Sequence, residues 1–296
     1  MIGSRPDQKM LSHEALGLWR IARCAVLVAS AAVAAMGADA LPDAPPATLE
    51  AGYRQMYNLQ FTEAHQTFQD WQKSHSDDPL GPASDAAQYL FSEFDRMHIL
   101  QSEFFTHDQH FYTDRKLTAD PAVKQRFQQA LAMSRGLANR QPGSRAEFAA
   151  LLCDGLESDY TALIEKRYAA AFVQMKAGRT RAEKLLAANP NYYDAWIAVG
   201  VENYMLSVKL APVRWLLRLS GGETDRALGV EKLRLTAEKG HFLAPFARLL
   251  LAVAALRDRH TEEARKLLNG LCREFPRNPL YAVELARLET PRKATP

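Results

Sequence analysis

The chain has 296 residues, of which 47% are hydrophobic, 9% aromatic and 24% charged. Its 37 Lys and Arg nearly balance its 34 Asp and Glu, and a net charge of +3 gives no indication of a nucleic-acid binder, which usually concentrates basic side chains on one face. With 15 Gly, 15 Pro and 3 Cys, the composition excludes a collagenous or low-complexity chain and a disulfide scaffold.

Residues 1–40 have the pattern of a secretory signal peptide. The short apolar run 25–36 follows Arg20 and Arg23, and the run is followed by the small-x-small triplet Ala38–Ala40. The run has about twelve residues, whereas a helix that spans a bilayer needs about twenty. A cleaved signal peptide is therefore favoured, and an uncleaved inner-membrane anchor is the alternative. We therefore expect cleavage after Ala40 and a periplasmic or secreted mature protein.

Residues 41–47 are rich in proline and have little tendency to fold, so we expect a linker there. Residues 48–290 then carry apolar side chains at three- and four-residue intervals, which is the pattern of amphipathic helices. The clearest pair of helices lies at 245–278, where Ala264 precedes Leu268 by four residues and Pro276 ends the unit. This spacing of a small residue, a large residue and a proline matches the second half of a known helical repeat.

Related spacings occur upstream. Gly52, Ala64 and Phe68 follow the same order of small and large residues, and residues 196–200 read Trp-Ile-Ala-Val-Gly. Small residues are needed where the two helices of a pair approach closely. On these motifs the chain resembles the tetratricopeptide-repeat superfamily over roughly residues 47–290.

Part of the chain is similar to a narrower group, the exported bacterial tetratricopeptide-repeat proteins. The resembling segments are 192–196, 201–204, 212–219, 237–240 and 275–281. A weaker likeness, within 216–240, is to a eukaryotic repeat family linked with inclusion bodies and organelle membranes. The resemblance implies a solenoid of helical hairpins that binds partners and catalyses nothing, and it assigns no ligand and no cofactor.

The fold class that we predict is all-α, an irregular solenoid of antiparallel helix hairpins. Two insertions interrupt the pattern, near 101–118 and 206–223, and the hairpin between 143 and 189 is longer than the roughly 34 residues of a standard repeat. Residues 291–296 are expected to form a disordered tail. Cys153 and Cys272 both fall in helical apolar patterns, which favours buried thiols over a bridge.

Two further helix starts can be read from polar residues. Thr261 precedes Glu262 and Glu263, and Thr224 precedes Asp225, so we expect a side-chain N-cap at each place.

A groove for a partner is expected along the inner face of the first helices of the hairpins. The helix 246–256 is apolar nearly all round and has to be covered on every side. We expect the groove to capture a protein or peptide, on the helix-in-groove principle. An alternative is that the insertion 208–219 folds back and fills it. The candidate partner-binding residues are Asp194, Ile197, Val201, Tyr204, Phe246, Leu249 and Val253.

The insertion 208–219 also allows a different function. Its Arg214, Trp215 and Arg218 combine cationic charge with an aromatic ring, as in an interfacial helix attracted to anionic lipid. A plug helix inserted into the solenoid is the favoured interpretation of the segment. The corresponding alternative function is a hydrophobic-ligand carrier or a membrane-surface module.

A metal site is the most distant candidate. His107 and His110 lie near Asp108 and Asp114, and zinc accepts both imidazole nitrogen and carboxylate oxygen. The H-E-x-x-H spacing of many zinc hydrolases is missing, so a solvated loop is favoured over a metal-dependent hydrolase. The expected function is therefore a noncatalytic scaffold that binds a protein or peptide partner in the bacterial cell envelope.

Overall fold

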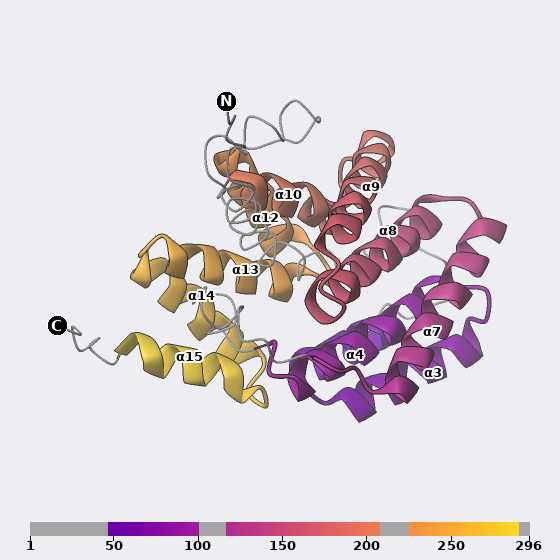
Figure 1. Ribbon diagram of the computed structural model, residues 1–296, viewed down its shortest axis with the longest axis horizontal. Coiled ribbons are helices and arrows are strands. Elements are labelled where there is room, and N and C mark those ends of the chain that lie inside the picture. The colour runs from indigo at the N-terminus through magenta and orange to yellow at the C-terminus, as the bar shows by residue number, and fades with distance from the viewer. Residues whose placement is uncertain (1–46, 101–116, 208–224, 290–296) are drawn as a thin grey trace, which may run out of the picture.

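The structure, a computed structural model, describes residues 47–100, 117–207 and 225–289. Within these ranges every regular element is a helix, and each helix contacts the next one along the chain (Figure 1). The predicted all-α solenoid is therefore confirmed.

The described helices form successive antiparallel pairs, followed by one last helix. In chain order the pairs are α2 (Ala47–Tyr57) with α3 (Phe61–Ser74), α4 (Leu80–Arg96) with α7 (Pro121–Arg140), α8 (Ser144–Asp159) with α9 (Tyr168–Ala188), α10 (Trp196–Ser207) with α12 (Arg226–Lys239), and α13 (Ala244–Arg257) with α14 (Thr261–Glu274), before α15 (Pro279–Glu289).

The turns between hairpins repeat a local geometry. The Asp78 side chain accepts a hydrogen bond from the Leu80 N–H at 3.1 Å, and the Asn278 side chain accepts one from the Leu280 N–H at 3.0 Å. Each side chain thus satisfies a backbone donor at the start of the following helix, as short polar side chains do in Asx turns. Two turns that are far apart in the sequence share one capping mechanism, which supports a repetitive architecture.

Glycine allows α10 and α12 to cross with their backbones in contact. A Cβ atom built on Gly229 would lie 2.4 Å from the Tyr204 nitrogen, and one built on Gly200 would lie 2.9 Å from the Leu233 nitrogen. In the first hairpin, a Cβ on Gly52 would lie 2.3 Å from the Phe68 ring. The prediction that small residues permit close helix pairs holds at these positions.

Two predicted N-caps have different outcomes. The Asp225 side chain caps α12 by accepting a hydrogen bond from the Leu228 N–H at 3.0 Å. Thr261 is instead the first helical residue of α14, whose N-cap position is His260 and has no side-chain hydrogen bond. The Thr261 prediction was wrong because the helix begins one residue earlier than the sequence pattern indicated.

The third hairpin is longer than a standard repeat of roughly 34 residues, as predicted. A five-residue π-helix, Tyr160–Ile164, continues α8 before the chain turns into the 21-residue α9. The π-helix is buried along its whole length. It extends the first helix of this hairpin by more than a turn, which explains why the apolar pattern runs on past Asp159.

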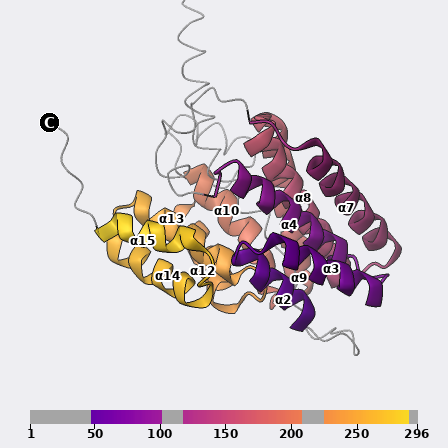
Figure 2. The ribbon, with the colours of Figure 1, turned by 90° about the horizontal axis from the view of Figure 1, so that it is seen from below.

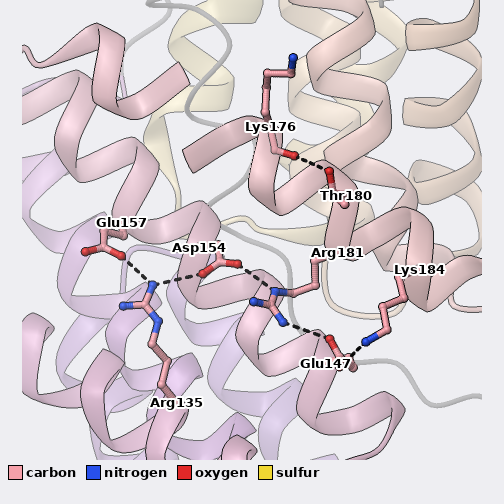
Figure 3. A network of polar contacts seen from close by, with 8 residues as sticks. All are labelled: Arg135, Glu147, Asp154, Glu157, Lys176, Thr180, Arg181 and Lys184. Carbon is pink, nitrogen blue, oxygen red and sulfur yellow. Dashed lines mark hydrogen bonds and ion pairs between the residues drawn. The ribbon is translucent and has the colours of Figure 1, made fainter. Parts of the chain in front are cut away.

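A network of charged side chains joins α7, α8 and α9 on their polar side (Figure 3). Asp154 of α8 accepts hydrogen bonds from Arg135 of α7 at 3.2 Å and from Arg181 of α9 at 2.9 Å. Arg181 and Lys184 also contact Glu147, at 3.0 and 3.4 Å. Because each of these charges faces an opposite one across a helix contact, the network orients the three helices rather than offering a charged surface to a ligand.

The first and last hairpins contact each other, so the solenoid closes on itself; we call this contact the seam (Figure 2). The Tyr57 hydroxyl donates to the Phe242 carbonyl at 2.8 Å, and the Asn278 side-chain amide donates to the Tyr57 carbonyl at 2.9 Å. The Asn58 side chain accepts from the Arg277 N–H at 3.0 Å. A single apolar core consequently extends from α2 to α15.

Candidate functional site

The apolar groove lies where the seam brings the two ends of the solenoid together. All its lining side chains except two are aliphatic or aromatic. They are Met56, Tyr57, Leu59, Phe91, Leu100, Phe246, Leu249, Val253, Asn278, Leu280, Tyr281 and Glu284.

One wall of the groove is a face of α13. Phe246, Leu249 and Val253 are three, four and seven residues apart, so they share one side of the helix. Phe246 is buried and meets Phe91 of α4 edge-on, with the ring centroids 5.7 Å apart. Leu249 and Val253 are partly exposed. The three residues of α13 that the sequence analysis singled out therefore do line a groove.

The opposite wall comes from both termini of the described chain. Leu59 follows α2 with a φ of 60°, and its N–H bonds to the Met56 carbonyl at 2.9 Å, which closes the last turn of the helix. On the other side, Asn278 precedes α15, and its side chain accepts a hydrogen bond from the N–H of Leu280, which lines the groove. Neither segment is near the other in sequence, so the groove exists only because the seam is closed.

The groove is small and almost uncharged. Its free volume is about 40 Å³, and one water molecule needs roughly 10–15 Å³ on this scale. Glu284, the one ionisable acid in the lining, is paired with Arg287 at 2.5 Å. Burial raises the pKa of Tyr57 and of Tyr281, so both phenols stay neutral at physiological pH. The site therefore suits one aliphatic or aromatic side chain and is too small to enclose an acyl chain.

The three residues of α10 that were predicted to line the groove do not line it, so this part of the prediction was wrong. Ile197 and Val201 are buried where α10 meets α8 and α9, and Tyr204 is buried at the contact of α10 with α12. These side chains belong to the core, because the inner faces of the first helices are covered by neighbouring helices of the same chain.

Asp194 has a structural role rather than a binding role. Its fully buried carboxylate accepts hydrogen bonds from the His241 N–H at 2.9 Å and the Leu243 N–H at 2.9 Å. Burial raises the pKa of Asp194 to about 7, against the lowering effect of these backbone donors. The side chain thus ties the start of α10 to the turn before α13.

Several other sequence-based candidates lie outside the described residues. They include Arg214, Trp215 and Arg218 of the insertion, and His107 and His110 of the possible metal site. Among the residues that are described, no group of three His, Cys, Asp or Glu is arranged to hold a metal ion. In the same part of the chain, no helix has both the length and the apolar character needed to cross a membrane.

Both described cysteines are free thiols. Cys153 is fully buried, as predicted, and burial raises its pKa to about 11. Cys272 is only partly buried.

A second and larger cavity, which we call the seam pocket, lies at the seam as well. Its volume is about 370 Å³, within the range of small-molecule sites. None of the residues predicted to bind a partner lines it. Its lining residues are Glu50, Ala51, Tyr53, Arg54, Tyr57, His241, Phe242, Pro245, Glu274 and Phe275.

The rim of the seam pocket carries both signs of charge. Glu50 of α2 contacts the His241 side chain, and burial lowers the pKa of His241 more than Glu50 raises it. Glu274 forms an ion pair with Arg248 at 2.6 Å. Arg54 lies over the Phe275 ring, 5.9 Å from its centroid, and reaches the Glu274 carbonyl at 3.4 Å.

The sequence held a partial signal for this pocket. Glu50 and Arg54 are four residues apart, as are Tyr53 and Tyr57, so α2 presents charges and rings on adjacent faces. Nothing in the local pattern indicated that residues near 241 and 275 complete the pocket.

Comparison of the chain with protein-family models, with curated proteins and with solved structures gave no match.

Proposed function

We propose that the protein is a noncatalytic scaffold that binds a protein or peptide partner by taking one large apolar side chain of that partner into the apolar groove. The observation that carries the proposal is the groove itself. Its lining is apolar and partly exposed at Leu249, Val253 and Leu280, and its free volume of about 40 Å³ suits a single side chain. The small volume favours a peptide anchor over the hydrophobic-ligand carrier.

We further propose that the hairpins are of the tetratricopeptide type and that the protein works in the cell envelope. The repeated turn geometry of Asp78 and Asn278 supports the first statement. The signal-peptide pattern of residues 1–40 supports the second.

Selection from a random twelve-residue peptide library, displayed on phage and panned on the purified protein, tests this function. We expect enriched peptides to share a Leu, Phe or Trp. Replacing Leu280 by Asn should weaken their binding about tenfold or more, since burying one large apolar side chain contributes roughly 1.5–3 kcal/mol and 1.4 kcal/mol corresponds to a factor of ten.

Val283→Asn is the matched control, because Val283 lies on the same helix but is 44% exposed and does not line the groove. The control should bind the selected peptides as the unaltered protein does. The proposal is wrong if no peptide is enriched, or if Leu280→Asn keeps full affinity while its melting temperature shows that it is folded.

A further inference from the structure

Acidic side chains accompany the lining of the apolar groove on two of its helices. On α15, Leu280 lines the groove and Glu284 follows it by four residues; on α4, Phe91 lines the groove and Asp95 follows it by four residues. Residues four apart on a helix share one face, with their Cβ atoms about 5–6 Å from each other. Each carboxylate is therefore one helical turn away from an apolar residue of the lining.

The turn that ends α4 places Asp95 at the edge of the groove. The Ile99 N–H donates to the Phe94 carbonyl at 2.7 Å, which closes the turn, and the next residue, Leu100, lines the groove. Lining residues thus lie on both sides of Asp95 in the chain, with Phe91 one helical turn before it and Leu100 directly after the closing turn.

The two carboxylates differ in what compensates their charge. Glu284 forms an ion pair with Arg287. Asp95 is partly buried, and within the described ranges its side chain has neither an ion pair nor a hydrogen bond. Burial raises the pKa of Asp95 more than the neighbouring His98 lowers it. A cation placed beside Asp95 would therefore offset the cost of removing this carboxylate from water.

We propose that the partner's apolar anchor is accompanied, within two residues, by a lysine or arginine whose charge pairs with Asp95; this inference rests on the proposed function. Two residues of extended chain span about 7 Å, so a long cationic side chain can reach a carboxylate that lies one helical turn from the anchor. None of the described residues that line the groove is cationic. An acidic residue at the same place in the partner would face the negative charge of Asp95 and be disfavoured.

A biased phage library tests the proposal. Each peptide carries Leu, Phe, Trp or Ser at a central position, and Lys, Gln or Glu at the two positions on either side. Panning on the unaltered protein at low salt should enrich Lys over Gln, and Gln over Glu, beside an apolar anchor. High salt should reduce this preference, because salt screens a partly exposed pair.

Synthetic peptides then give the size of the effect. Two versions of the best selected peptide, with Lys or with Gln at the enriched position, should differ about three- to tenfold in dissociation constant. This range lies between an exposed ion pair and a hydrogen bond to a charged group.

One variant and one control assign the preference to Asp95. Asp95→Lys should reverse it, so that Glu replaces Lys beside the anchor. A lysine suits the last turn of α4, since cations are favoured near the C-terminus of a helix, and the melting temperature checks that the variant is folded. Glu238→Lys makes the same change in net charge at an exposed position of α12 that does not line the groove, and it should keep the preference for Lys.

The two proposals fail in different ways. If Leu, Phe and Trp are not enriched over Ser at the central position, the proposed function is wrong, and the role of Asp95 falls with it. If they are enriched without a basic neighbour, only the role of Asp95 is overturned. The same holds if the folded Asp95→Lys variant selects the same neighbours as Glu238→Lys.

Discussion

Gly229 is the position where one added methyl group should do the most damage. A Cβ atom there would lie 2.4 Å from the Tyr204 nitrogen, 2.8 Å from the Tyr204 Cα and 2.9 Å from the Gly200 carbonyl oxygen. All three atoms belong to the backbone of α10, so no side-chain rotation can relieve the overlap. Gly229→Ala must therefore push α10 and α12 apart.

Two effects of opposite sign decide the outcome. Alanine is favoured over glycine inside a helix by about 0.5–1 kcal/mol, whereas overpacking costs typically 1–3 kcal/mol and more when the backbone has to move. We expect a net loss of about 2 kcal/mol, because the clash involves backbone on both sides. In a domain of this size, that loss lowers the melting temperature by about 4–8 °C.

The same substitution elsewhere provides the control. Gly136 lies on an exposed face of α7, and a Cβ atom built there meets nothing within 4 Å. Gly136→Ala should gain the helix preference alone and raise the melting temperature by about 1–4 °C. Thermal unfolding followed by circular dichroism at 222 nm compares the two variants. A melting temperature of Gly229→Ala equal to or above that of Gly136→Ala would refute the argument from close helix crossing.

Two further predictions concern buried ionisable groups. Burial raises the pKa of Asp194 to about 7 from its usual 3.8, so the folded state binds a proton more tightly than the unfolded state does. The stability that the protonated carboxyl contributes is therefore lost as the pH rises from about 4 to 7. The free energy of unfolding of the wild type, minus that of Asp194→Asn, should therefore fall between pH 5 and pH 8 in urea titrations; a constant difference contradicts this. For the thiols, mass-spectrometric mapping after brief alkylation should find Cys272 modified in the folded protein and Cys153, with its pKa of about 11, modified only on unfolding. Equal modification of both thiols would show that the core opens readily.

The sequence predicted the helices well because helix periodicity is a local property. The expected helix 246–256 is observed as Ala244–Arg257, and Gly52, a small residue of the repeat pattern, lies where the Phe68 ring closely approaches α2. The unusual length of the third hairpin was also visible, since its apolar residues continue without a break. Where the prediction of Thr261 as an N-cap failed, the error was a single residue.

The candidate groove was predicted only in part, and the reason is geometric. In an open solenoid, the inner faces of all first helices would be exposed, which placed Ile197 beside Leu249 in one expected groove. In this protein the neighbouring helices cover the inner face of α10, so Ile197 is fully buried, whereas Leu249 stays partly exposed. Local amphipathicity is the same in both cases and does not distinguish a core face from a binding face.

What the sequence determined by itself is the set of helices, their order in hairpins and the residues on each apolar face. Only the tertiary structure decided that α2 meets the last hairpins, because that contact depends on the summed rotation of every hairpin in between. The hydrogen bonds from Asn278 to Tyr57 and from Arg277 to Asn58 join segments more than two hundred residues apart. Both the apolar groove and the seam pocket arise from that contact, so neither could be read from any single stretch of the chain.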